Sequence, residues 1–124
     1  VGSRFAASIE SSSHNNFKET IVNTLEGGTQ LTLKELAPVR LIKNKFYQDV
    51  QDLYQKCPSK EELVQLLGRA RAKKGMFEGD LEEGELEIGQ VAGLIHEILP
   101  VEEIIQQMIA EFETASKEKT TFEF

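Results

Sequence analysis

The stretch 84–100, Gly84-Glu-Leu-Glu-Ile-Gly-Gln-Val-Ala-Gly-Leu-Ile-His-Glu-Ile-Leu-Pro100, organises the rest of the chain. Acidic residues crowd its first half, and its middle carries no charge. The spacing predicts a helix that places Gly89, Ala92 and Gly93 on one side. These residues have no side chain or only a methyl group, so they leave space along that side. Such a side lets a backbone or a flat ligand come close. Gln90 stands at the head of this helix, where free backbone N–H groups point outward.

Two interpretations of this small-residue side are open. It is either a tight contact with another helix or a sheet, with Gln90 as a polar cap, or the wall of a ligand pocket. Spacing alone favours the packing contact, because motifs of this kind are weak evidence for a ligand.

Composition and charge exclude several classes of protein. The chain has 124 residues, enough for one domain with a core, and it is 40% hydrophobic and 28% charged. Its formal net charge of −7 argues against a nucleic-acid partner. No apolar run approaches the roughly 20 residues that span a bilayer, so we expect no membrane segment. The single cysteine, Cys57, excludes an internal disulfide, and together with the missing signal-peptide pattern it predicts a cytoplasmic protein.

The N-terminus suggests part of a longer protein. The chain begins at Val1 without methionine, and Val1–Ala7 reads like the end of a buried strand that runs into a loop. We therefore expect a strand here and a larger parent.

Hydrophobic periodicity predicts four further helices and a β-hairpin. Apolar residues, Leu25 the last of them, recur every four positions on the expected buried side of a helix that starts after Ser13, its expected N-cap, and ends at Gly27-Gly28. The same spacing predicts helices over 45–56 and 101–112, and over 60–75, where Ser59 and Glu62 form a capping box. Segments 29–34 and 39–43 read as two short strands joined by a turn.

Two groups of basic residues are candidates for an anionic ligand. Arg40 and Lys43 lie in or beside the second strand, and either could reach an anion, although solvated charges on an edge strand are the more common case. Residues Arg69, Arg71 and 73–74 form a basic cluster near the end of the predicted helix 60–75. This cluster could hold a phosphate or an acidic carrier protein, but complementing the helix dipole explains it adequately.

No metal site is predicted. The acidic loop 76–86 lacks the alternating ligands and the closing Glu of a calcium-binding loop, so we interpret it as solvated. The two histidines, His14 and His96, have no nucleophile beside them, and no residue completes a catalytic set.

The ordered segments of the chain nevertheless resemble one family. The segments are Val1-Gly-Ser-Arg-Phe5, Glu10-Ser-Ser-Ser-His-Asn-Asn-Phe-Lys18, Pro38-Val-Arg-Leu-Ile-Lys-Asn-Lys-Phe46, Glu78-Gly-Asp-Leu-Glu-Glu-Gly84, Gly89-Gln-Val-Ala-Gly-Leu-Ile95 and Glu97-Ile-Leu-Pro-Val-Glu-Glu-Ile-Ile105. They resemble the nitronate monooxygenases, formerly called 2-nitropropane dioxygenases, and their relatives, the flavin-dependent enoyl-acyl-carrier-protein reductases. Any one segment is a weak match, but their order is fairly specific, and the residues beyond about 113 add nothing.

The resemblance implies an α/β parent, an FMN-binding TIM barrel, of which this chain would be a mainly helical α+β C-terminal part. Residues 1–28 would hold the last barrel strand and the following helix, and 29–44 the β-hairpin. Residues 45–113 would form a helical region over the flavin site, and 114–124 a frayed tail. Self-association of such a part through uncovered apolar faces is expected.

The resemblance also implies roles for four residues. Gly2 and Ser3 would bind the FMN phosphate, with Ser3 standing where the family usually has threonine. Gly89 and Gln90 would lie at the flavin or substrate pocket, preceded by Ile88 where alanine is usual. The family's catalytic histidine belongs to a segment that this chain lacks, so neither His14 nor His96 takes that role, and this polypeptide alone should neither hold FMN tightly nor turn over substrate.

Three functions follow as hypotheses. The first is FMN-dependent oxidation of alkyl nitronates, small-molecule substrates, with oxygen. The second is FMN-dependent reduction of enoyl-acyl-carrier-protein with a nicotinamide. The third, from another class, is a non-catalytic helical module that docks a partner through 101–112.

Overall fold

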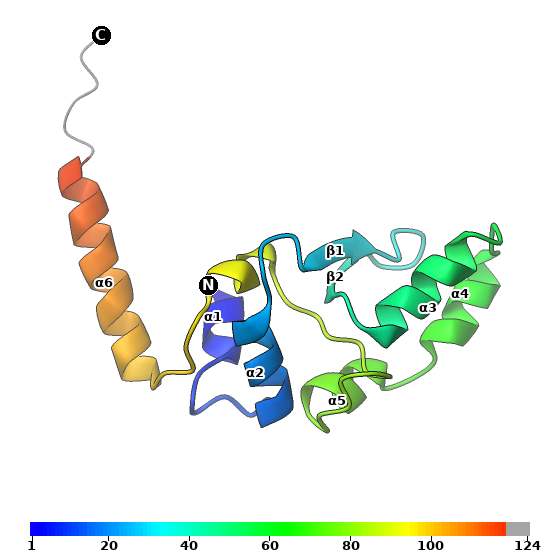
Figure 1. Ribbon diagram of the computed structural model, residues 1–124, viewed down its shortest axis with the longest axis horizontal. Coiled ribbons are helices and arrows are strands. Elements are labelled where there is room, and N and C mark those ends of the chain that lie inside the picture. Colours follow the sequence, from blue (N-terminus) through cyan, green and yellow to red (C-terminus); the bar gives the residue numbers. More distant parts are fainter. Residues whose placement is uncertain (119–124) are drawn as a thin grey trace, which may run out of the picture.

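The computed structural model describes residues 1–118 and shows a mixed α+β arrangement. A β-hairpin lies between a group of helices that contains both α1 and α2 and a second group that contains α3 and α4, while α6 extends away from the first group (Figure 1). In chain order the elements are α1 (Gly2–Ala6), α2 (Asn15–Asn23), β1 (Thr29–Thr32), β2 (Val39–Ile42), α3 (Lys45–Tyr54), α4 (Lys60–Leu67), α5 (Arg71–Met76), the 3₁₀ helix η1 (Gln90–Leu94) and α6 (Val101–Glu118).

The prediction of a strand at Val1–Ala7 is wrong, because Gly2–Ala6 forms the short helix α1. The Val1 carbonyl accepts hydrogen bonds from the N–H groups of Arg4 (3.1 Å) and Phe5 (3.5 Å). A segment without a sheet edge to pair with satisfies its backbone groups locally, and a helical turn does so. Immediately after α1, Ser8 forms one parallel bridge with Leu99.

The predicted hairpin is confirmed. Strands β1 and β2 pair in antiparallel register from Thr29 opposite Ile42 to Thr32 opposite Val39. The stretch 84–100 then runs along the other side of β2, where Ile42 N–H donates to the Leu86 carbonyl at 2.9 Å. This contact places the stretch at the centre of the fold, beside the hairpin.

The predicted helix 60–75 is two helices. The capping box at its start is confirmed, since Ser59 Oγ accepts from Glu62 N–H at 3.2 Å. However, Gly68 and Ala70 both have positive φ angles, 63° and 58°, which end α4 before α5 begins. Arg71 then stabilises the free C-terminal carbonyls of α4, since its guanidinium donates to the Leu67 carbonyl at 2.8 Å.

Two smaller predictions for α2 are also wrong. The N-cap is His14 rather than Ser13, because His14 Nδ1 accepts from Asn16 N–H at 3.0 Å. Leu25, expected on the buried side of this helix, lies beyond its end and is 80% exposed.

Two hydrophobic clusters hold the fold together, and neighbouring residues of β2 belong to one each. Leu41 belongs to the cluster under α3 and α4, and Ile42 to the cluster under α1, α2 and η1. The first cluster consists of Leu33, Leu41, Phe46, Val50 and Leu63. The second consists of Ala7, Phe17, Ile21, Ile42, Leu86, Ile88, Ala92 and Ile95.

Helix α6 confirms the prediction for 101–112 and continues to Glu118, so the frayed tail predicted at 114–124 is wrong for 114–118. Residues 119–124 lie outside the described part of the chain. Ile104 is buried against the body, whereas Ile109 and Phe112 are 55% and 72% exposed. Among residues 1–118, no helix has the length and apolar character that a bilayer crossing needs.

Candidate functional site

The candidate site is an open groove of about 470 Å³ at the junction of α1, β2 and the stretch 84–100. We call it the Ser3 groove. It brings together Gly2, Ser3 and Gly89, three of the four residues that the sequence assigns to cofactor or pocket. Its lining residues are Gly2, Ser3, Ala6, Pro38, Val39, Arg40, Glu87, Ile88 and Gly89.

Two consecutive backbone amides build the groove. The N–H of Gly89 donates to Ser3 Oγ at 2.9 Å, which fixes the stretch to α1. The N–H of Ile88 donates to the Arg40 carbonyl at 3.2 Å, which fixes the same stretch to β2. Ser3 and Arg40 therefore stand on opposite sides of one extended segment, both held by it.

The small residues of the stretch each meet a close neighbour. A Cβ at Gly89 would lie 2.7 Å from Ser3 Oγ, so a side chain there would displace the Ser3 hydroxyl. A Cβ at Gly93 would lie 3.3 Å from the backbone of Glu26, and Ala92 is fully buried. These contacts support the packing interpretation of the small side, and at Gly89 the packing also shapes the candidate site.

One group of the groove, the Ser3 hydroxyl, can donate to an anion, whereas the Arg40 side chain is directed to Thr29 of β1. Ser3 Oγ accepts its hydrogen bond from Gly89, and its own hydroxyl proton can still be donated. Arg40 Nη1 donates to Thr29 Oγ1 at 3.2 Å and to the Thr29 carbonyl at 3.4 Å. One carboxylate, that of Glu87, lines the same groove.

Gln90 does not join this groove. It is the first residue of η1, its side chain is exposed, and it is not among the residues that line the Ser3 groove. A role for Gln90 at a flavin or substrate pocket therefore stays a prediction.

The sequence missed Glu85, which was expected in a solvated loop but is only 6% exposed. Burial, followed by a hydrogen bond to Glu87, raises the pKa of Glu85 to about 7, and the Arg71 charge offsets only part of this. Glycines at Gly75 and Gly84 let two backbones meet and draw Glu85 inward, since a Cβ at Gly75 would lie 3.0 Å from Gly84 Cα. This glycine pair is the signal in the sequence that could have indicated a buried neighbour.

The rest of the acidic loop is also held by specific contacts, so the expectation of a merely solvated loop is wrong there too. The Asp80 carboxylate accepts from the N–H groups of Glu83 (2.9 Å) and Glu82 (3.1 Å), and these bonds keep the pKa of Asp80 below its usual value. Over residues 1–118, no cluster of three or more His, Cys, Asp or Glu side chains is arranged to hold a metal ion.

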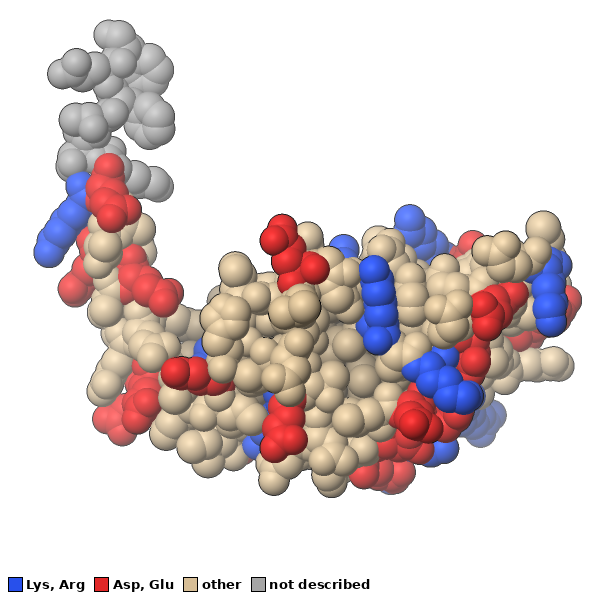
Figure 2. All heavy atoms as spheres, in the orientation of Figure 1, with Lys and Arg blue, Asp and Glu red and all other residues tan. Residues whose placement is uncertain are grey.

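The basic cluster of residues 69–74 is largely neutralised by its neighbours. The Arg71 guanidinium lies 4.4 Å from the centre of the Phe46 ring and donates to the Glu83 carbonyl at 2.8 Å. Lys74 pairs with Asp80 at 3.5 Å, and Lys73 lies 4.0 Å from Glu78. Among residues 1–118, these contacts leave Arg69 as the basic residue of this cluster without an ion pair. Figure 2 shows basic and acidic side chains mixed together over the end of the molecule that carries α3 to α5.

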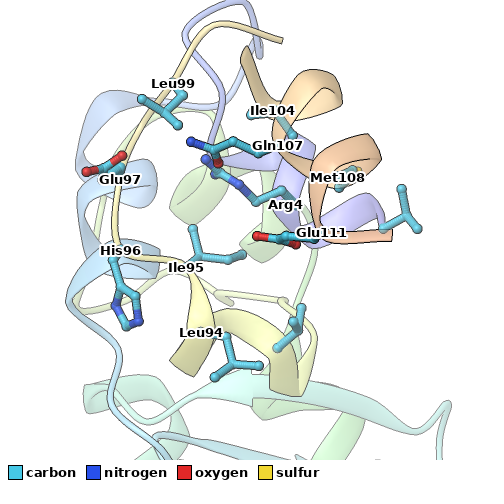
Figure 3. A pocket seen from close by; sticks show the side chains of 12 residues that line it. Arg4, Leu94, Ile95, His96, Glu97, Leu99, Ile104, Gln107, Met108 and Glu111 are labelled. Carbon is cyan, nitrogen blue, oxygen red and sulfur yellow. The ribbon is translucent and has the colours of Figure 1, made fainter. Parts of the chain in front are cut away.

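A larger groove of about 610 Å³ lies between α1, the segment after η1 and α6 (Figure 3). Arg4, Gln107 and Glu111 lie close together on its α1–α6 side, and Leu94 and Ile95 lie along the other. His96 lines its edge with an exposed side chain, while His14 serves as the cap of α2. That neither histidine is catalytic stays a prediction.

Comparison with known proteins gives two consistent results. The family model described as nitronate monooxygenase matches residues 1–111. FabK from Thermotoga maritima is 32% identical, with a TM-score of 0.82. A point variant of the same FabK is 34% identical, with a TM-score of 0.76. Each alignment covers 94% of this chain but only 37% and 34% of the FabK chains. A comparison with curated proteins finds no match.

The matched segment includes the whole Ser3 groove, together with α1 to η1 and most of α6. The chain spans about a third of the length of the solved structures it matches. It nevertheless carries the family pattern over nearly all of its own length. This chain therefore belongs to the nitronate monooxygenase family, whose members are FMN-dependent oxidoreductases with a TIM-barrel fold.

Proposed function

We propose that the Ser3 groove binds the phosphate of FMN, and that the chain thereby contributes one end of the flavin site in an oxidoreductase. One observation carries the proposal. Gly2 and Ser3 are neighbours in the sequence, Gly89 lies 86 residues beyond Ser3, and the 2.9 Å bond from Gly89 N–H to Ser3 Oγ brings them around one groove. In TIM-barrel enzymes, phosphate groups are commonly held near the last strands and a short extra helix, a position that α1 would match.

The residues of the groove fit a phosphate monoester. The Ser3 hydroxyl can donate one hydrogen bond to a phosphate oxygen. The space around Gly2 is open, since a Cβ there would meet no atom within 4 Å. When bound, FMN would supply reversible acceptance of electrons, while the residues of this chain would anchor and orient its phosphate.

Two reactions are candidates for the whole enzyme. Oxidation of alkyl nitronates with oxygen is supported by the description of the matching family. Reduction of enoyl-acyl-carrier-protein is supported by the likeness to FabK, a flavin-dependent enoyl reductase of the same family, over 94% of this chain. Arg71, Lys73 and Lys74 are paired with acidic neighbours and offer no separate support for a carrier-protein site, so the comparison with FabK carries the second candidate.

An assay of the holoenzyme that contains this sequence separates the two reactions. Nitronate oxidation predicts oxygen consumption with an alkyl nitronate and no NADH oxidation with a crotonyl thioester. Enoyl reduction predicts the reverse. A holoenzyme without bound flavin, inactive in both assays, would contradict the oxidoreductase proposal itself. The expected cytoplasmic location stays a prediction.

We also propose that this chain self-associates. Its exposed apolar residues include Val1, Leu94, Ile109 and Phe112, which are 86%, 76%, 55% and 72% exposed. Exposed apolar surface of this extent drives association between copies. We expect a concentration-dependent increase in mass by size-exclusion chromatography with light scattering, reduced in the double variant Ile109→Ser, Phe112→Ser.

The matched control for this measurement is Gln106→Ser, which changes an exposed polar residue of the same helix and should leave the mass unchanged. A strictly monomeric chain at every concentration would contradict self-association. That result would favour the third hypothesis, an independent interaction module.

A further inference from the structure

Glu87 places a carboxylate in the Ser3 groove, on the same side as the Ser3 hydroxyl. Its neighbours in the chain hydrogen-bond to β2, so the backbone is extended there. Side chains alternate along an extended segment, and Glu85, Glu87 and Gly89 therefore share one face. Gly89 is also the residue whose N–H donates to Ser3 Oγ at 2.9 Å. This face thus presents the Glu87 carboxylate next to the proposed phosphate position.

Glu85 holds the Glu87 carboxylate from behind. Glu85 is only 6% exposed, whereas Glu87 is half-buried. The two side chains are hydrogen-bonded, and burial together with this bond raises the pKa of Glu85 to about 7. Below that pH, Glu85 is the protonated partner and donates to Glu87. The Glu87 carboxylate is therefore oriented before any ligand binds, which lowers the entropic cost of binding.

The Glu87 carboxylate keeps acceptor positions free. An ionised carboxylate has about four lone-pair sites, of which the bond from Glu85 uses one. Among residues 1–118, Glu87 takes part in no ion pair. An oriented carboxylate of this kind suits a ligand with hydroxyl donors, as acidic side chains that bind ribose hydroxyls in dinucleotide-binding folds illustrate.

We propose that Glu87, positioned by Glu85, accepts hydrogen bonds from the hydroxyl groups of a polyol phosphate whose phosphate lies at Ser3. This inference rests on the proposed function, and it extends the site from the phosphate of FMN to its ribityl chain. A bare phosphate meets only repulsion from the Glu87 carboxylate, whereas hydroxyl groups beside the phosphate donate to it. The groove, of about 470 Å³, has room for both parts of such a ligand.

The test compares D-ribitol 5-phosphate with pentyl phosphate, which has the same number of carbon atoms and no hydroxyl group. Each is titrated into the ¹⁵N-labelled chain below the pKa of Glu85, and its affinity is measured by NMR at the amides of Ser3 and Gly89. We expect the wild-type chain to bind ribitol 5-phosphate about tenfold more tightly, the effect of one hydrogen bond to a charged group.

Glu87→Ala should abolish this preference and also bind pentyl phosphate more tightly than the wild type does, because a negative charge has left the groove. A variant that merely disturbed the structure would bind both ligands more weakly. The matched control is Glu82→Gln, which removes the charge of an exposed acid from the same loop and should leave both affinities unchanged.

Two variants test the positioning role of Glu85. Glu85→Gln keeps a donor for Glu87 and should keep the preference for ribitol 5-phosphate. Glu85→Leu removes the donor and should lower the preference in a chain that still gives the folded spectrum. A preference in folded Glu85→Leu equal to that of the wild type would contradict positioning by Glu85.

The remaining outcomes separate this inference from the proposed function. If the wild type binds both ligands equally, or if Glu87→Ala keeps the preference, the role of Glu87 is wrong and the phosphate site at Ser3 stands. If neither ligand moves the Ser3 and Gly89 amides in the wild type, the phosphate site itself is wrong, and the role of Glu87 falls with it.

Discussion

Replacing Gly84 with alanine is expected to destabilise the chain by about 3 kcal/mol or more, because overpacking of this severity cannot be relieved by moving a flexible side chain. A Cβ at Gly84 would lie 2.6 Å from the Gly75 nitrogen, and it would also collide with Gly75 Cα and the Asp80 carbonyl oxygen. All three are backbone atoms, so α5 would have to separate from the stretch 84–100. Urea unfolding followed by circular dichroism measures the loss.

The matched control is Gly2→Ala, whose added Cβ meets no atom within 4 Å. We expect this variant to unfold within about 0.5 kcal/mol of the wild-type chain, as open surface substitutions do. A Gly84→Ala chain as stable as Gly2→Ala would contradict the contact between α5 and the stretch 84–100.

The second large effect is a loss of stability with rising pH that depends on Glu85. Its pKa in the folded chain is about 7, against an ordinary value of 4.5. Below pH 4.5 Glu85 is protonated in both the folded and the unfolded chain, and its stabilising contribution is fully present. Between pH 4.5 and about pH 7 the folded chain binds more protons than the unfolded chain. The free energy of unfolding therefore falls as the pH rises through this interval. The total change is about 3 kcal/mol.

Glu85→Gln isolates this effect, because the amide resembles the neutral carboxylic acid and does not titrate. We expect the variant and the wild type to have similar stability at pH 4.5, and the variant to be more stable at pH 8. Glu82→Gln changes an exposed acid in the same loop and should follow the wild-type pH profile. Parallel profiles for Glu85→Gln and the wild type would show that Glu85 is not held neutral.

Sequence patterns predicted the parts of the fold that depend on local chemistry. The hairpin, the capping box at Ser59 and the helix from Val101 all follow from neighbouring residues. The errors arise where distant contacts decide. The segment Val1–Ala7 is apolar enough for a strand, but it forms helix α1, and within residues 1–118 no strand pairs with it. The break between α4 and α5 depends on two positive φ angles, one of them at Ala70, which no propensity scale would indicate.

In the candidate site too, single residues could be predicted from the sequence, whereas the contacts between distant segments could not. The family resemblance named Gly2, Ser3 and Gly89, and the structure places all three around one groove. The bond between Ser3 and Gly89, which are 86 residues apart, could not be read from either segment alone. Whether Arg40 reaches an anion likewise depends on the hairpin, which directs its side chain to Thr29. Burial of Glu85 likewise depends on the contact of Gly75 with Gly84.

The central claim is that the Ser3 groove binds the phosphate of FMN. Its most direct test compares FMN with riboflavin, which lacks the phosphate, as ligands of the ¹⁵N-labelled chain. We predict weak, saturable shifts of the Ser3 and Gly89 amides with FMN and none with riboflavin. Equal shifts with both ligands, or shifts with FMN that leave the Ser3 and Gly89 amides unmoved, would contradict the claim.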